Sequence, residues 1–514
     1  MSNIRNASGS AKTKCSRTIK LAPMTRAVRS ALAVSALALA FGASGGAFAA
    51  GHKIPQAQVL QVERAAIDFA PVHDLTAVAP PISLEVPVEL HPTLISEYAV
   101  GDVVIDNIDP IDDVSIYYSA TAISGYSSEG SVDITNHAGA DLLAASLFGD
   151  AIGIYGYATI GDVSIDNAAD VYAFSGYYLA DGIFASGANV DVANSGAIDV
   201  YGYTWAAGIE AQGADSVSVT NSGDITATAS GFYQGYVYSY LYQAGGVFAY
   251  TPGGDAFGIY ATAGEGGATV DNSGNIEVQG GYVTGVEVQS GGDIAVTNSG
   301  DIVAGNGLNV NQVYYYDPIQ AAYTYYTGTQ VATGINATSN GEGAHVAVSN
   351  SGDITADAIF GATGIAATSG GYGGTASVEN SGDIAVSQYN NAGYGAYGIA
   401  VSADGDGSID NSGNIQVASG GAAYGEIVLS FAGDASVTNS GDIDVATTGS
   451  KYYNATGITA FAGNGSASVD NSGNVSAYSA GILYSSTRAV DAQGQQGVTV
   501  TNSGSLYANG KYAY

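Results

Sequence analysis

Basic residues and cysteine are scarce in this chain. Its 514 residues include one cysteine, Cys15, and 12 Lys and Arg against 46 Asp and Glu, which gives a formal net charge of −34. One cysteine cannot form an intramolecular disulfide, so packing has to stabilise the fold. Nucleic acid is bound by clustered Lys and Arg, which this chain does not have. We therefore expect no nucleic-acid partner.

The few basic residues are concentrated at the N-terminus. Seven of the twelve lie between Arg5 and Arg29, ahead of an apolar stretch at 31–41 and the small-residue sequence Ala47-Phe48-Ala49. This order predicts that residues 1–49 are a signal peptide cleaved after Ala49. The apolar stretch is too short to span a bilayer, which weighs against the alternative of an N-terminal anchor. Cleavage would leave five basic residues against all 46 acids, a formal charge of −41.

One seven-residue phrase, Val-Thr-Asn-Ser-Gly-Asp-Ile, organises the rest of the chain. It occurs in full at 219–225, 296–302 and 437–443. Its core Asn-Ser-Gly occurs ten times, beginning at Asn194, Asn221, Asn272, Asn298, Asn350, Asn380, Asn411, Asn439, Asn471 and Asn502. Three divergent copies begin at Asn107, Asn136 and Asn167. Self-similarity over so long a stretch indicates a stacked repeat rather than ordinary globular domains.

The order of residues in the phrase predicts the strands and the turn of each repeat. Residues two apart on a strand share a face, so Val219 and Asn221 should point inward while Thr220 points outward. Ser222-Gly223 supplies a turn in which glycine is free to take positive φ. A Gly-Ile-x-Ala element, such as the one that begins at Gly364, completes a unit of three short strands.

The spacing of the repeats predicts the fold. Most of the repeat Asn residues are 26 to 32 residues apart, which is one turn of a parallel β-helix. Stacked turns about 4.8 Å apart enclose a continuous aliphatic core and align the Asn side chains in a hydrogen-bonded ladder. We therefore predict an all-β fold, a right-handed parallel β-helix of about thirteen three-strand coils over residues 101–514. Residues 50–100 hold six of the ten prolines and lack the phrase, so we predict a leader and N-terminal cap there.

Two repeats carry long inserts, at about 226–257 and 303–333, on the same corner of the unit. The insert tyrosines are the candidate binding residues: Tyr233, Tyr236, Tyr238, Tyr240 and Tyr242 in the first, and Tyr314, Tyr315, Tyr316, Tyr323, Tyr325 and Tyr326 in the second. Tyrosine combines a flat apolar ring with a hydrogen-bonding tip, which suits contact with carbohydrate or protein. The alternative is that these rings only pack within the inserts.

Catalytic and metal sites are weakly signalled. Asp112-Asp113 is the only Asp-Asp pair, and neighbours on a strand point to opposite faces, so we interpret it as a solvated turn rather than a catalytic pair. Residues 404–407, Asp-Gly-Asp-Gly, lack the later ligands of a calcium loop and are interpreted as a turn. We predict no catalytic residue, cofactor or metal. Whether Ca²⁺ relieves repulsion between the Asp residues that follow the repeat phrase, such as Asp353 and Asp383, stays open.

The tandem repeat phrases, the Gly-Ile-x-Ala elements and the long basic leader resemble the passenger domains of bacterial autotransporters. The resemblance covers residues 1–49 and 100–514. It implies an extended signal peptide, export by the Sec machinery, and a β-helix displayed on the cell surface or released, commonly for adhesion or biofilm formation. Members of that family also carry a C-terminal barrel, for which the twelve residues after Asn502 are too short.

These observations favour a non-enzymatic, adhesin-like rod in the outer membrane or outside the cell. Its expected partners are a glycan or protein on a host or bacterial surface, or a second copy of the chain, met through the tyrosine-rich edge. The alternatives are a polysaccharide-active β-helix enzyme and a structural spacer or fragment of a passenger.

Overall fold

The computed structural model describes residues 94–230, 232–233, 251–252, 254–305, 329–389, 395–448, 453–480 and 486–513. These residues belong to one compact unit that spans Pro87–Tyr514. They form β-strands and no helix, so this part of the chain holds no apolar helix able to cross a bilayer. The predicted signal peptide with its cleavage site at Ala49, and residues 50–93 of the predicted leader and cap, lie outside the described residues.

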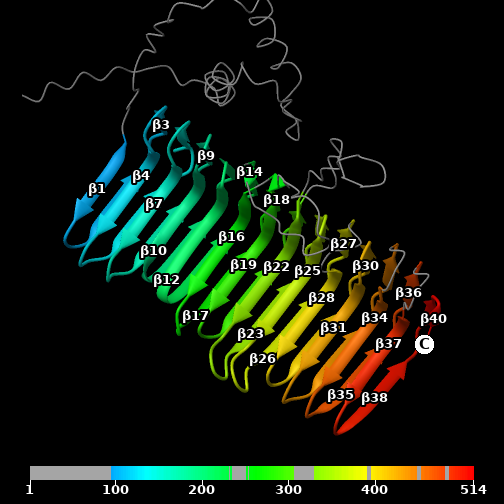
Figure 1. Ribbon diagram of the computed structural model, residues 1–514. Helices are drawn as coiled ribbons and strands as arrows, with labels where there is room; N and C mark the ends of the chain where they lie inside the picture. Colours follow the sequence, from blue (N-terminus) through cyan, green and yellow to red (C-terminus); the bar gives the residue numbers. More distant parts are fainter. Residues whose placement is uncertain are drawn as a thin grey trace, which may run out of the picture. The chain divides into compact units, whose positions relative to one another are not determined.

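The strands form three parallel stacks, and each turn of the chain adds one strand to every stack (Figure 1). The Gly-Ile stack contains β1 (Ile95–Ala99), β4 (Ala120–Ser127), β7 (Ala151–Ala158), the first part of β10 (Leu179–Asn194) and of β12 (Trp205–Asn221), β16 (Asp255–Ala263), β19 (Tyr282–Ser290), β22 (Val331–Ser339), β25 (Gly361–Ser369), β28 (Gly395–Ala403), β31 (Ala423–Ser430), β34 (Ala455–Ala462), β37 (Ser486–Gly494) and β40 (Tyr512–Ala513).

The Asn stack ends each of its strands on a repeat Asn. It contains β2 (Val103–Asn107), β5 (Val132–Asn136), β8 (Val163–Asn167), the last parts of β10 and β12, β17 (Gly267–Asn272), β20 (Ile294–Asn298), β23 (His345–Asn350), β26 (Thr375–Asn380), β29 (Gly407–Asn411), β32 (Ala435–Asn439), β35 (Ser466–Asn471) and β38 (Gly497–Asn502).

The third stack follows the Asn-Ser-Gly turn. It contains β3 (Ile111–Ser115), β6 (Leu142–Ser146), β9 (Val171–Ser175), β11 (Ile198–Gly202), β13 (Ile225–Ala229), β18 (Ile276–Gln279), β21 (Ile302–Ala304), β24 (Ile354–Ala358), β27 (Ile384–Gln388), β30 (Ile415–Ser419), β33 (Ile443–Thr447), β36 (Val475–Ser479) and β39 (Leu506–Asn509).

The predicted parallel β-solenoid is therefore confirmed, with two qualifications. The Gly-Ile and Asn stacks belong to one sheet of 25 strands, because β10 and β12 run through both without a turn, while the third stack is a separate sheet of 13 strands. In addition, β1 lies within the range predicted as leader and cap, yet it already pairs in parallel with β4.

The core is aliphatic and continuous along the stacks. Val219 and Asn221 are both buried, and Thr220 between them is exposed, as the alternation of the phrase requires. The Ile of the Gly-Ile element points into the same core, where Ile365 pairs in register with Ile335 on one side and Ile399 on the other. Each turn covers the apolar face of the next, which no single turn could bury alone.

The turn glycines have a different role from the predicted one. None of the Asn-Ser-Gly glycines is among the residues with positive φ, so conformational freedom is not the reason for glycine there. A Cβ atom on Gly382 would lie 2.0 Å from the carbonyl oxygen of Gly352 in the preceding turn. Glycine is required because successive turns approach each other too closely for any side chain.

Asp112-Asp113 is a strand and not the predicted solvated turn. Both residues lie in β3, and Asp113 is buried at a position that pairs with Ala144 of β6. Its carboxylate accepts a hydrogen bond of 2.7 Å from the backbone N–H of Thr121. The hydrogen bond compensates for the burial of this carboxylate and gives it a structural role.

Candidate functional site

The repeat Asn side chains form an uninterrupted ladder. From Asn107 to Asn502, each side-chain amide donates to the side-chain oxygen of the Asn one turn further along, over 2.7–2.8 Å. From Asn194 onward the same amide also donates to the carbonyl oxygen of the turn glycine. The twelve Asn residues from Asn107 to Asn471 are buried, so their polar atoms stabilise the stack and are closed to a ligand.

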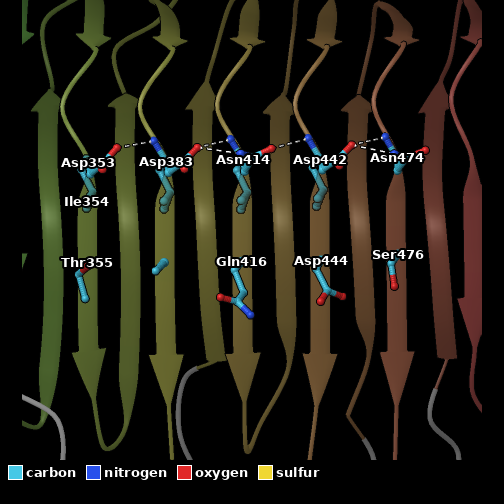
Figure 2. A pocket seen from close by; sticks show the side chains of 14 residues that line it. Asp353, Ile354, Thr355, Asp383, Asn414, Gln416, Asp442, Asp444, Asn474 and Ser476 are labelled. Carbon is cyan, nitrogen blue, oxygen red and sulfur yellow. Dashed lines mark hydrogen bonds between the residues drawn. The ribbon is translucent and has the colours of Figure 1, made fainter.

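A second ladder lies outside the first, on the residue after the turn glycine. Asp353 accepts a hydrogen bond from the backbone N–H of Asp383, which in turn accepts from Asn414. Figure 2 shows this row of Asp and Asn side chains across five turns, beside a shallow groove of about 510 Å³. The floor of the groove is the outer face of the third stack, with Thr355, Gln416 and Asp444 along it.

The carboxylates of this row are engaged within the solenoid. Among the described residues, no group of three His, Cys, Asp or Glu side chains is placed to hold a metal ion. In the Asp-Gly-Asp-Gly turn, Asp404 accepts from the backbone N–H of Gly373 and Asp406 from that of Asp434, over 2.7 and 2.8 Å. In the Asp and Asn row and in this turn, the carboxylates accept hydrogen bonds from backbone N–H groups of neighbouring turns. These acidic side chains therefore help to hold the turns together.

The tyrosine-rich inserts each follow a third-stack strand in the sequence. The first follows β13 and the second follows β21, and β18 pairs with both of these strands. Tyr233 belongs to β14 (Phe232–Tyr233), which pairs antiparallel with β15 (Thr251–Pro252). The other candidate tyrosines, Tyr236, Tyr238, Tyr240, Tyr242, Tyr314, Tyr315, Tyr316, Tyr323, Tyr325 and Tyr326, lie outside the described residues.

The same corner carries a row of rings on the first four turns, which we call the corner column: Tyr117, Phe148, Tyr177 and Tyr203. The first three are stacked, and Tyr203 is tilted by 37° against Tyr177. Their ring centroids are 5.9, 5.1 and 5.7 Å apart in succession. Tyr117 is 73 % exposed, Phe148 43 % and Tyr177 40 %. The parallel register of the turns aligns these rings, and the corner position leaves them in solvent.

A second set of rings lies on the outer face of the Gly-Ile stack. Tyr98, Tyr126 and Tyr157 stack with centroids 4.7 and 5.4 Å apart and nearly parallel planes. Tyr155 stacks on Phe184 in the same way at 5.2 Å. Aromatic rings therefore follow two lines along the N-terminal half of the described solenoid.

Sequence analysis missed a third cluster, which we call the acid–aromatic patch: Asp181, Trp205, Glu210, Phe257, Tyr260 and Glu287. It lies on the outer face of four consecutive turns, β10 to β19. Glu210, Tyr260 and Glu287 pair in register, so two carboxyl groups lie on either side of one tyrosine. The residues come from different turns, and no local motif connects them in the sequence.

The carboxyl groups of the patch are buried although they point outward. Asp181 is 2 % exposed, Glu210 8 % and Glu287 7 %. The indole N–H of Trp205 donates to Asp181 over 3.1 Å. The side-chain amide of Asn336 donates to both oxygens of Glu287, over 2.9 and 3.0 Å.

Burial controls the protonation of these groups. It raises the pKa of Asp181 well above the ordinary value, and the charge of Glu210 raises it further. Burial also raises the pKa of Glu210 and of Glu287, against smaller opposing effects of the amide donors Gln212 and Gln289. Groups whose pKa is perturbed by desolvation, gathered beside aromatic rings, are typical of functional sites.

Comparison with known proteins adds no further information. No protein-family model, no curated protein and no solved structure matches this chain. The functional argument therefore rests on the geometry of the described residues.

Proposed function

We propose that the protein is an exported, non-enzymatic, adhesin-like rod that attaches to surface glycans, cells or other bacteria along its tyrosine-rich corner. The observation that supports this most directly is the corner column. A row of stacked rings that served only to stabilise the solenoid would be stabilised further by burial, whereas Tyr117 at its first position is 73 % exposed. Such a row offers apolar faces and hydroxyl tips at regular spacing, which suits a repeating sugar chain.

Export by the Sec machinery is part of the proposal and rests on the basic leader within residues 1–49. The kinship with autotransporter passengers is also part of the proposal, and it rests on the repeat phrase. The fold is consistent with both, because a solenoid without disulfides can be threaded through a membrane unfolded and then stack turn by turn.

Attachment can be tested with a column variant that carries Tyr117→Ser, Phe148→Ser and Tyr177→Ser. We expect the melting curve of this variant to show that it is folded. We also expect it to bind glycan arrays and bacterial cells much more weakly than the parent. Tyr372→Ser is the matched control, because Tyr372 is 78 % exposed and lies on another part of the solenoid. Unchanged attachment by the column variant and by a variant with serine at the insert tyrosines would contradict the proposal.

One observation favours a second candidate function, cleavage of a polysaccharide. Glu210 and Glu287 lie two turns apart on one face, which at about 4.8 Å a turn is roughly 10 Å between their backbones. Inverting glycosidases hold two carboxyl groups about 6.5–9.5 Å apart. A turnover assay on acidic and neutral glycans separates the functions, since release of reducing ends that is lost in Glu210→Gln would establish the enzyme.

A further inference from the structure

The acid–aromatic patch has carboxyl groups but no positively charged partner. The Lys and Arg among the described residues are Arg488 and Lys511, both in the last turns, where Arg488 pairs with Asp491. In the described part of the chain the other ion pair joins His137 to Asp106, also away from the patch. Three buried carboxyl groups on four adjacent turns therefore have no Lys or Arg counter-charge among the described residues.

The rings of the patch are arranged differently from the other aromatic rows. The ring centroid of Trp205 lies 4.6 Å from that of Phe257 and 5.6 Å from that of Tyr260, and the ring planes are inclined at 38° and 85°. Phe257 and Tyr260 are inclined at 59°. Inclined rings present faces in several directions, whereas the nearly parallel rings of Tyr98, Tyr126 and Tyr157 cover each other's faces. All three rings are half-buried, so parts of these faces reach solvent.

We propose that the acid–aromatic patch binds the ammonium group of an amino sugar. The ligand class, a glycan, rests on the proposed function, but the site uses different residues from the corner column. A bound cation favours the ionised form of these buried carboxyl groups, whose pKa burial raises, so they supply the counter-charge once the cation is present. An ammonium group is also attracted to the faces of Trp and Tyr rings. The amides of Gln212, Gln289 and Asn336 border the carboxyl groups and can bond sugar hydroxyls.

The charge of the patch determines which sugars it accepts. A uronic acid or another anionic sugar would meet only acidic groups in Asp181, Glu210 and Glu287 and would find no counter-charge among the described residues around them. An N-acetylated sugar of the same length has no charge to pair with them. The patch should therefore distinguish a free amine from its acetamide, which is a sharper property than general attachment to glycans.

The experiment uses Trp205, the single tryptophan of the chain, as an intrinsic reporter. The full-length protein is titrated with a glucosamine tetramer and, separately, with the fully N-acetylated tetramer, while tryptophan emission is followed. We expect a saturable change with the amine only. Replacing Glu210→Gln and Glu287→Gln together should weaken binding by about tenfold or more, because two charged contacts are lost.

The matched control removes the same charge elsewhere. Asp353→Asn with Asp383→Asn, on the third stack, should leave the affinity unchanged. Equal weakening by this control would show general attraction to an acidic protein and would overturn the proposal, as would equal binding of the two tetramers or no saturable change. Melting curves of each variant establish that it is folded.

The outcome can be separated from that of the proposed function. The column variant keeps the whole patch, so it should retain the amine-specific change at Trp205 even where attachment to cells is lost. If attachment depends on the column and the patch ignores both tetramers, the proposed function stands and this inference falls.

Discussion

Glu426 pairs in register with Ile399, so a carboxyl group occupies a core position that holds isoleucine in the preceding turn. Ile458 occupies the same position in the turn that follows. Glu426 is fully buried, and neither of its carboxyl oxygens has a hydrogen-bond partner. Burial raises the pKa of Glu426 to about 8, with a smaller opposing effect of the Asn411 side chain and a smaller raising effect of Asp410.

Because of this carboxyl group, we predict that the free energy of unfolding falls as the pH rises. Below the unfolded-state pKa of about 4.5 both states hold the proton, and Glu426 gives no pH dependence. Between that value and about 8 the unfolded state releases the proton while the folded state keeps it, so unfolding becomes easier. The loss should be on the order of 3–5 kcal/mol across this window, measured by denaturant unfolding at pH 4, 6 and 9.

The variant Glu426→Ile isolates this effect. It restores the aliphatic pattern of the neighbouring turns and removes two unpartnered polar atoms, so we expect it to be more stable than the parent at pH 4 and by a wider margin at pH 9. Glu379→Gln, at an exposed position of β26, is the control and should change neither value much. If the parent and Glu426→Ile lose stability in parallel with rising pH, the account of Glu426 is wrong.

A second prediction concerns the Asn ladder. Asn350 accepts from Asn298 and donates to Asn380 and to the carbonyl oxygen of Gly352. Asn350→Ala should cost roughly 2–5 kcal/mol of unfolding free energy, because buried polar groups on both sides lose a partner. Asn502→Ala, at an exposed position, should cost much less. Equal losses would indicate that the ladder does not act through buried hydrogen bonds.

A third prediction concerns the close approach of turns at the Gly-Ile element. A Cβ atom on Gly364 would lie 2.5 Å from the carbonyl oxygen of Gly398 and from Cγ2 of Ile384. Gly364→Ala should therefore force two turns apart and cost about 1–3 kcal/mol or more. Gly101→Ala, where a Cβ would meet nothing within 4 Å, should be nearly neutral in the same unfolding assay.

A fourth prediction concerns the outer row of Asp and Asn. Asp301, Asp353 and Asp383 follow one another in register, each accepting a backbone N–H from the next turn. Asp383→Asn keeps an acceptor oxygen and removes one charge, as Asn414 does in the adjacent turn. We expect a small rise in melting temperature that is largest at low salt. Melting that also responds to millimolar Ca²⁺ against chelator in the parent, but not in this variant, would instead show that the row binds the ion.

The stacking of the turns could be predicted from the sequence because the same residues recur in it at corresponding positions. Val219, Asn221 and Ile225 recur in the same relation many times, and only turns in register place all copies inside. The same alignment places Glu426 in the core, because it follows Gly425 where other turns have Gly-Ile.

The acid–aromatic patch could not be predicted in that way. Asp181, Trp205 and Glu287 have no shared motif, and their proximity depends on which residues face outward in four separate turns. The role of the turn glycines could not be predicted either, because a turn considered alone suggests conformational freedom, whereas the constraint at Gly382 comes from the neighbouring turn.

The hydrogen bonds that link Asn350 to Asn298 and Asn380 are interchangeable with those of any other turn. A segment such as residues 351–380 begins and ends at equivalent points of the repeat, so its removal leaves matching surfaces to close on each other. The length of such a protein can therefore change by whole turns while the contacts between turns keep their form, and outward-facing residues on either side of the segment come nearer or move further apart in steps of one turn.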